Sequence, residues 1–200
     1  QLTEAGAKWL DPTGVLEAGI PLCPPEGDAD TGMVATNAVA VGKGNVSAGT
    51  SIFAMIVMQE SLKKAYPEID VITTPEGRPV AMVHCNNCTG DIDGWVGLFH
   101  ELSQSLGLEL PRSRLYDVFY QQALLGEAHC GGVMSYNFLS GEHLVKLDSG
   151  RPLLMRLPDS NFTLANFARS LLYSSMATLK IGLDVLIQEE GVELRELVGH

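Results

Sequence analysis

The pattern of apolar and polar positions predicts several short β-strands. Two β-prone runs, residues 45–48 and 51–58, are separated by Gly49 and Thr50, and this arrangement predicts a hairpin because glycine supplies the backbone freedom of a tight turn. The turn is expected to expose backbone amides and hydroxyl groups. The other predicted strands are residues 71–73, 80–84, 133–138 and 153–157.

Helical spacing of apolar residues predicts four helices. The first covers residues 31–41, with Asp28 or Asp30 placed to cap its N-terminus. The others are a helix that opens at Asp91, a helix over residues 115–125 and a long helix over residues 163–189 without an internal proline. Hairpins that form a sheet, followed by helices that cover one face of it, indicate an α/β or α+β layer arrangement.

The first thirty residues lack this periodicity. Five prolines or glycines fall between Gly19 and Gly27, which predicts an irregular connecting segment or the edge of a domain. The chain begins with Gln1 and ends at His200 soon after a helical pattern, so we expect both ends to be cut from a longer protein.

Composition and charge exclude some function classes. The net charge is −11 and no basic cluster is longer than Lys63-Lys64, so the positive surface of a nucleic-acid-binding protein is missing. The longest apolar run, residues 52–58, is shorter than the roughly 20 residues of a membrane helix, and the N-terminus has no basic-then-apolar signal pattern. With four cysteines in 200 residues, we expect a cytoplasmic protein with free thiols and no membrane partner.

An acidic turn precedes the first predicted helix. Glu26, Asp28 and Asp30 lie within five residues, next to glycines that let a backbone approach a ligand. The carboxylates either bind a polar ligand or simply cap the helix. A calcium loop is excluded, because the twelfth position counted from Glu26 is Asn37.

The hairpin between residues 46 and 51 offers a second polar group. Ser47, Thr50 and Ser51 place hydroxyls around Gly49, as a loop needs to surround phosphate oxygens, although plain turns share this composition.

Cysteine and histidine residues suggest a third candidate, a zinc site. Cys85 and Cys88 have the spacing of zinc ligands, but His129 and Cys130 are adjacent and complete a tetrahedral set poorly. Buried free cysteines are the favoured interpretation, so no metal ligand is assigned. The sequence contains no Gly-x-Ser-x-Gly elbow and no Walker-type loop.

Taken together, the motifs resemble the FGGY carbohydrate kinases, the group that includes xylulose, ribulose and glycerol kinases. The resemblance begins with Glu26-Gly-Asp-Ala-Asp-Thr-Gly-Met33 and Val46-Ser-Ala-Gly-Thr-Ser51, about twenty residues apart. It continues through Ala81-Met-Val-His-Cys-Asn-Asn87, Trp95-Val-Gly-Leu-Phe99, Asn137-Phe-Leu-Ser-Gly-Glu142 and the helix that starts near Thr163. The resemblance implies a domain of the actin-like ATPase or ribonuclease H-like fold, with a mixed sheet and flanking helices.

The resemblance also implies roles for particular residues. Asp28 matches the general base, which takes the proton from the sugar hydroxyl as its oxygen attacks the terminal phosphate of ATP. Gly49, Thr50 and Ser51 match a phosphate-binding loop, with ATP and Mg²⁺ as the implied cofactors and a sugar or polyol as the substrate. Such chemistry depends mainly on positioning, since the transition state is loose. Whether Asp30 shares the role of Asp28 stays open.

Three departures limit what this chain is expected to do alone. The family's first phosphate loop and the sugar-binding residues belong to an N-terminal domain that these residues do not include, and the adenosine-binding segment would follow His200. We therefore expect residues 1–30 to be the end of that domain or an interdomain segment, and residues 31–200 to be a truncated, inactive C-terminal domain. His143 stands where the family often has Arg, and Tyr173 where Glu is frequent, which indicates a divergent subgroup whose sugar stays open.

Three hypotheses follow. The first is an ATP-dependent kinase of a sugar or polyol, and the second is a non-catalytic regulatory protein that uses nucleotide-driven closure as a switch. The third, ranked last, is a zinc module at Cys85 and Cys88. An apolar face left by the missing domain is expected to favour a homo-oligomer.

Overall fold

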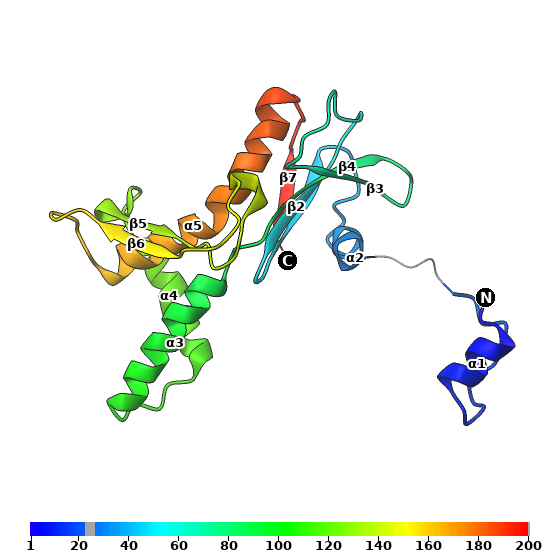
Figure 1. The fold of residues 1–200 in the computed structure, drawn as a ribbon, viewed down its shortest axis with the longest axis horizontal. Coiled ribbons are helices and arrows are strands. Elements are labelled where there is room, and N and C mark those ends of the chain that lie inside the picture. Colours follow the sequence, from blue (N-terminus) through cyan, green and yellow to red (C-terminus); the bar gives the residue numbers. More distant parts are fainter. Residues whose placement is uncertain (23–26, 200) are drawn as a thin grey trace. The chain divides into compact units, whose positions relative to one another are not determined.

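The computed structural model describes residues 1–22 and 27–199, with the backbone but not the side chain of Asp28. The chain divides into two compact units, Gln1–Thr31 and Gly32–His200, which are described separately. Figure 1 shows the elements of both units in chain order.

The first unit contains a helix that the sequence pattern missed. Helix α1 (Glu4–Leu10) is capped by Thr3, whose hydroxyl accepts a hydrogen bond from the Gly6 amide. After the helix, the Asp11 carboxylate accepts hydrogen bonds from Thr13, Val15 and Leu16, and these bonds, led by the one from the Thr13 hydroxyl, lower its pKa. The prediction of a wholly irregular first segment is therefore wrong.

Helix α2 (Asp28–Ala35) lies earlier in the chain than predicted. It ends before residue 41 because Asn37 adopts a left-handed backbone (φ 55°). The amides of Asn37 and Ala38 then donate to the carbonyls of Val34 and Met33, which closes the helix in a Schellman arrangement. Since the helix starts at Asp28, neither Asp28 nor Asp30 precedes it, and the prediction that Asp28 or Asp30 caps the helix is wrong.

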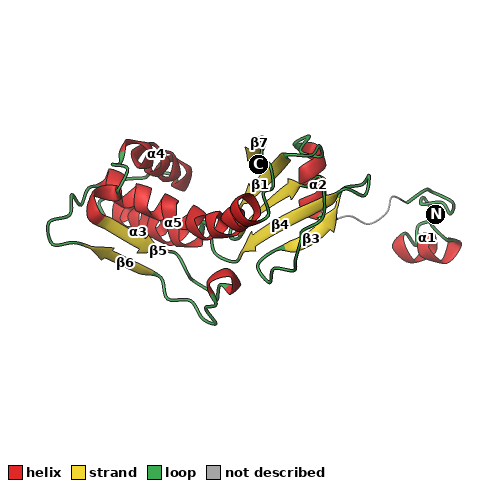
Figure 2. Cartoon of the chain, turned by 90° about the horizontal axis from the view of Figure 1, so that it is seen from above, coloured by secondary structure: helices red, strands yellow, loops and turns green. Residues whose placement is uncertain are grey.

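The second unit is built on a mixed five-stranded sheet with the order β3-β4-β2-β1-β7. Neighbouring strands are antiparallel except for β7, which runs parallel to β1. This sheet with its flanking helices confirms the predicted α/β fold class (Figure 2). The strands are β1 (Lys43–Ala48), β2 (Ile52–Val57), β3 (Asp70–Thr73), β4 (Pro79–Cys85) and β7 (Glu196–Gly199).

The β1–β2 turn is one residue longer than predicted. Ala48 pairs with Ile52, so residues 49–51 all belong to the connection. Ser51 lies in the turn because its carbonyl accepts a hydrogen bond from the Gly49 amide (2.8 Å).

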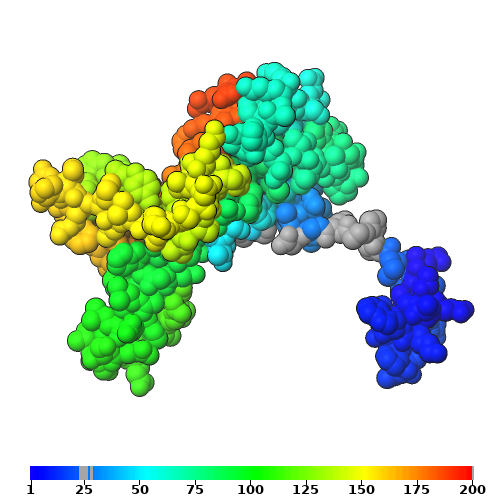
Figure 3. All heavy atoms as spheres, in the orientation of Figure 1, coloured from blue at the N-terminus to red at the C-terminus, as the bar shows by residue number. Residues whose placement is uncertain are grey.

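A long helix joins the sheet to the rest of the second unit. Helix α5 (Leu164–Asp184) continues as a π-helical turn (Val185–Glu189), and its C-terminal half packs against a core centred on β2 and β4. Its N-terminal half packs in a second core with α3 (Gly90–Ser105) and α4 (Arg112–Leu125). A small antiparallel sheet lies along the same helix and consists of β5 (Val133–Tyr136) and β6 (Leu153–Arg156). Figure 2 shows α5 running between both groups of elements, and Figure 3 shows the α3–α4 hairpin as a green lobe.

Helix α5 with its π-helical turn is also the one span in residues 1–22 and 27–199 that is long and apolar enough to cross a membrane. One such helix is weak evidence for a membrane span, because core helices have the same length and composition. Here Leu171 and Leu179 lie in the two cores, and polar Ser175 is buried on the same helix. The helix therefore contributes side chains to both cores.

The contact between α5 and the sheet depends on a glycine. A Cβ atom added at Gly182 would overlap Cγ1 of the fully buried Val83. Gly182→Ala is therefore expected to lower the free energy of unfolding by about 1–3 kcal/mol in urea denaturation, the usual range for overpacking.

The matched control is Gly94→Ala in α3, where an added Cβ meets nothing within 4 Å. Alanine should raise the free energy of unfolding there by about 0.5–1 kcal/mol, since it is the better helix former. Equal effects of the two substitutions would contradict the tight contact at Gly182.

Candidate functional site

The β1–β2 turn presents a group of hydrogen-bond donors. Gly49 and Thr50 are exposed and Ser51 is half-buried. Within the described part of the chain, the amides and hydroxyls of Thr50 and Ser51 have no acceptor. Bare amides and short hydroxyls beside a glycine are suited to an anion with several oxygens, such as a phosphate group.

The carbonyl groups of the turn are occupied by the β4–α3 connection (residues 86–89). The Cys88 amide donates to the Thr50 carbonyl (2.9 Å). The amide and the hydroxyl of Thr89 both donate to the Gly49 carbonyl, at 3.1 and 2.9 Å. The turn is thus held through its acceptors while its donors stay available.

The same hydrogen bonds place the N-terminus of α3 beside the turn. Thr89 precedes Gly90, and its hydroxyl bonds to Gly49 instead of capping its own helix. Within the described part of the chain, the amides of residues 90–92 have no acceptor. Helix N-termini carry a partial positive charge and bind anions. Thr89 was missed from the sequence because a threonine before a helix has the pattern of an ordinary cap.

Two carboxylates in the first turn of α3 oppose this positive charge. Burial raises the pKa of Asp91, partly offset by a hydrogen bond from the Trp95 side chain. The exposed Asp93 accepts a hydrogen bond from the Tyr116 hydroxyl (3.0 Å). An anion at this end of α3 would therefore bind best when a cation accompanies it.

Asp28 is the first residue of α2, and its side chain lies outside the described residues. It belongs to the first unit, whereas residues 49–51 belong to the second. The predicted role of Asp28 as general base therefore stays a prediction.

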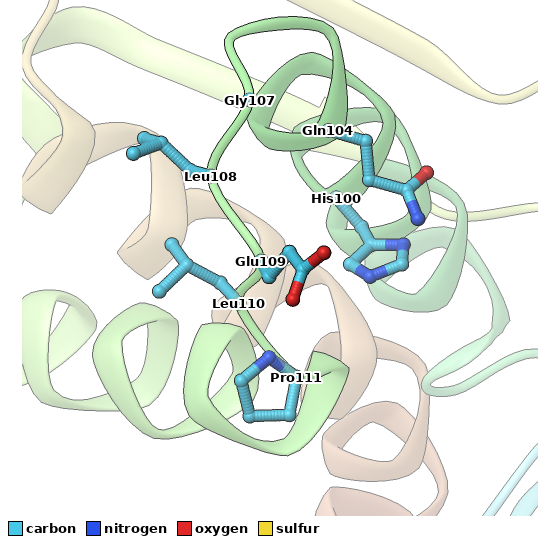
Figure 4. A pocket seen from close by; sticks show the side chains of 7 residues that line it. All are labelled: His100, Gln104, Gly107, Leu108, Glu109, Leu110 and Pro111. Carbon is cyan, nitrogen blue, oxygen red and sulfur yellow. The ribbon is translucent and has the colours of Figure 1, made fainter.

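A hollow lies at the other end of α3. It has a volume of about 580 Å³ and is lined by the C-terminal half of α3, which contributes His100, and by the α3–α4 connection, which contributes Glu109 and Pro111 (Figure 4). A 16-residue helix is about 24 Å long, so this hollow is remote from the β1–β2 turn. It is not part of the phosphate-binding candidate.

Comparison with known proteins identifies the family. The model of the C-terminal domain of the FGGY family of carbohydrate kinases matches residues 44–200, which is most of the chain. The chain belongs to the FGGY family of carbohydrate kinases. The resemblance seen in the sequence motifs is confirmed. No curated protein matches the chain.

Solved structures share the fold of this FGGY domain. Xylulose kinase from Rhodospirillum rubrum has a TM-score of 0.70 at 16% identity, with 92% of this chain and 35% of that chain covered. Xylulose kinase from Bifidobacterium adolescentis has a TM-score of 0.65 at 18% identity, with 93% and 35% covered. Plasmodium falciparum glycerol kinase with ADP has a TM-score of 0.63 at 16% identity, with 92% and 35% covered. The chain thus spans about a third of the length of these kinases.

The cysteines of the FGGY domain lie in its core. Cys85, Cys88 and Cys130 are buried free thiols. Burial raises the pKa of Cys85 to about 12 and that of Cys88 to about 11, with smaller contributions from Glu142 and Asp93 respectively. The part of the chain that the structure describes has no group of three or more His, Cys, Asp or Glu side chains suited to a metal ion. The zinc hypothesis gains no support.

These thiols should be inert in the folded chain. At about pH 8 both are protonated and buried, so their reaction with iodoacetamide should be at least about tenfold slower than in urea-unfolded chain. Peptide mass spectrometry can follow Cys85 and Cys88 separately. Rapid labelling of both in the folded chain would contradict their burial.

The same pKa shifts give a pH dependence with a definite sign. The unfolded thiols ionise near the ordinary value of 9.0, whereas the folded ones stay protonated up to about 11 and about 12. The stability contribution of the protonated thiols is therefore full below pH 9.0 and falls as the pH rises through the folded values. Replacing both Cys85 and Cys88 by Ala should therefore reduce the fall of the unfolding free energy with rising pH in this alkaline range, as measured by urea denaturation at a series of pH values.

Proposed function

We propose that this chain is part of an ATP-dependent kinase that phosphorylates a hydroxyl group of a sugar or polyol. The observation that carries the proposal is the β1–β2 turn, where free amides and hydroxyls lie beside the N-terminus of α3 in an FGGY domain. In phosphoryl transfer, donors that hold the phosphate oxygens and a base at the acceptor hydroxyl supply much of the catalysis.

In this proposal Gly49, Thr50 and Ser51 bind the phosphates of ATP. The exposed glycine leaves room for a phosphate oxygen to approach the backbone, and the amides and hydroxyls of Thr50 and Ser51 can donate to it. Mg²⁺ that accompanies ATP supplies positive charge at the phosphates. This charge offsets the repulsion between the phosphates and the carboxylates in the first turn of α3.

Asp28 is the proposed general base. A carboxylate close to the acceptor hydroxyl takes its proton as the hydroxyl oxygen attacks the terminal phosphate, and this makes the oxygen a better nucleophile. Asp28 is the first residue of α2. Asp30 lies two residues further on in the same helical turn and is the natural comparison.

The remaining parts of the kinase lie in other residues of the proposed full-length protein. We propose that an N-terminal domain supplies the sugar site, that residues 1–30 lead from it, and that residues 31–200 form most of the C-terminal domain. Closure of the two domains on ATP would bring the sugar hydroxyl to the base, so residues 1–200 alone should not phosphorylate sugars. We place the kinase in the cytoplasm, where ATP is available and thiols stay reduced.

The test of the base uses the full-length kinase and a panel of ketoses, aldoses and polyols. Asp28→Ala should lower kcat by at least about 100-fold on the preferred substrate, the usual contribution of a general base, and leave ATP binding unchanged. Asp30→Ala is the matched control and should keep kcat within about tenfold of the wild type, since it preserves the base.

Two outcomes would overturn this assignment. An Asp30→Ala enzyme as impaired as Asp28→Ala would mean that the carboxylates act together or only support the helix. Tight ATP binding without turnover on any substrate would favour the nucleotide-driven switch over the kinase.

The phosphate donors have a separate signature. Replacing Thr50 by Val removes a hydroxyl donor but keeps the β-branched shape, so the KM for ATP should rise about tenfold, as expected for a lost hydrogen bond to a charged group, while the KM for the sugar stays constant. An unchanged KM for ATP would remove the Thr50 hydroxyl from the proposed site.

A further inference from the structure

The β4–α3 connection is held on two sides. On one side, Cys88 and Thr89 donate to the carbonyls of Thr50 and Gly49. On the other side, the Asn86 side chain donates to the Gly141 carbonyl (2.9 Å), and Asn87 bonds to residues 140–142. Hydrogen bonds through the connection therefore join the segment around Glu142 to the β1–β2 turn.

Glu142 is the centre of the second set of hydrogen bonds. Its Oε2 accepts from the backbone amide of Asn87 (3.2 Å) and from the Asn87 side-chain amide (3.0 Å). The Asn87 side-chain oxygen in turn accepts from the amide and hydroxyl of Ser140, at 2.9 and 3.1 Å. Asn87 is thus fixed at its backbone and at both ends of its carboxamide.

The burial of Glu142 is unusual for a carboxylate. The residue is 0% exposed, and its Oε1 has no hydrogen-bond partner among the described residues, while Nδ1 of His143 lies 3.5 Å from it. Burying a carboxylate is costly unless hydrogen bonds and charges compensate for lost water. An apolar side chain of similar size would fill this space at a lower cost in free energy. The contribution that is specific to Glu142 is therefore the pair of hydrogen bonds that it accepts from Asn87.

We propose that Glu142 is a positioning residue for phosphate binding. By fixing Asn87, it keeps the next two amides, those of Cys88 and Thr89, aligned on the carbonyls of the β1–β2 turn, and so keeps the donors of Thr50 and Ser51 available to phosphate. This inference rests on the proposed function, because it assigns Glu142 to the same phosphate site.

A purely structural role for Glu142 predicts something different. Loss of a structural carboxylate would weaken the whole second unit, whereas loss of a positioning residue loosens the connection and the turn while the sheet keeps its stability. Cys88 has a further anchor, since its carbonyl accepts from the Asn137 side chain and the Ser175 hydroxyl, both at 3.0 Å. The connection should therefore loosen without detaching from α5.

The experiment compares two replacements of Glu142 in the 200-residue chain. Glu142→Leu removes the acceptor at similar volume, and Glu142→Gln keeps one carbonyl oxygen that can accept from Asn87. Amide hydrogen exchange of Cys88 and Thr89 should speed up at least about tenfold in Glu142→Leu and return most of the way in Glu142→Gln, with Val83 in β4 unchanged. Should Glu142→Leu fail to fold, Asn87→Ala removes the partner from the other side and should give the same pattern.

The matched control is Glu127→Gln. The Glu127 carboxylate also accepts from two side-chain amides, those of Asn161 and Asn166, but it has no link to the β1–β2 turn. Glu127→Gln should therefore leave the amide hydrogen exchange of Cys88 and Thr89 at the wild-type rate. Unchanged exchange at these amides in both Glu142→Leu and Asn87→Ala, or equally faster exchange at Val83, would overturn the proposal.

The link to phosphate is read separately in the full-length kinase. Glu142→Leu should raise the KM for ATP about tenfold, restored by Glu142→Gln, with little change in the KM for the sugar. If the variant shows faster amide exchange at Cys88 and Thr89 but the wild-type protein consumes no ATP, the proposed kinase function is wrong. The hydrogen-bond link from Glu142 to the connection would still hold. Faster amide exchange with an unchanged KM for ATP would contradict the positioning role of Glu142 in phosphate binding. The proposed kinase function would be unaffected.

Discussion

The carbonyl oxygens of Gly49 and Thr50 are held by donors from Cys88 and Thr89, and this short set of hydrogen bonds fixes which groups the β1–β2 turn presents. A free hairpin turn of this composition would exchange between conformers and offer its carbonyls as readily as its amides. Because the acceptors are already paired, the remaining groups are donors, and they lie next to the donors at the start of α3. The phosphate binding that we propose for this turn therefore depends on the β4–α3 connection as much as on the turn.

The β4–α3 connection can hold the β1–β2 turn because helix α5 joins the sheet to the other elements of the second unit. One half of α5 covers the sheet, where Gly182 permits close contact with Val83, and the other half organises α3 and α4 around Phe167. Ser175, between the two halves, reaches the Cys88 carbonyl. The β4–α3 connection is thus tied through Cys88 to the helix that contacts both cores.

The sequence pattern predicts much of this fold because its main elements have clear local signals. The β1–β2 hairpin follows from β-prone runs around Gly49, and α5 follows from a long apolar period without proline. Helix α1 was missed because it is short and buries only Ala7, and β7 was missed because four residues form a strand only with β1 as a partner. The end of α2 depends on the left-handed conformation of Asn37, which propensity does not specify.

The candidate site was only partly predictable for a physical reason. Gly49, Thr50 and Ser51 lie together in the sequence and could be found through the FGGY resemblance, whereas the contacts of Thr89 with Gly49 and of Glu142 with Asn87 join residues 40 and 55 positions apart. Such contacts follow from the packing of the whole unit. Asp28 came from the resemblance alone, and its role stays a prediction.

The most direct test of the central claim is a titration of the isotope-labelled 200-residue chain with ADP and Mg²⁺, followed by NMR of the backbone amides. A phosphate site at the β1–β2 turn predicts the largest shifts at Thr50, Ser51 and Gly90, at millimolar nucleotide. Shifts that spare these three amides, or that gather instead around the hollow near His100, would contradict it.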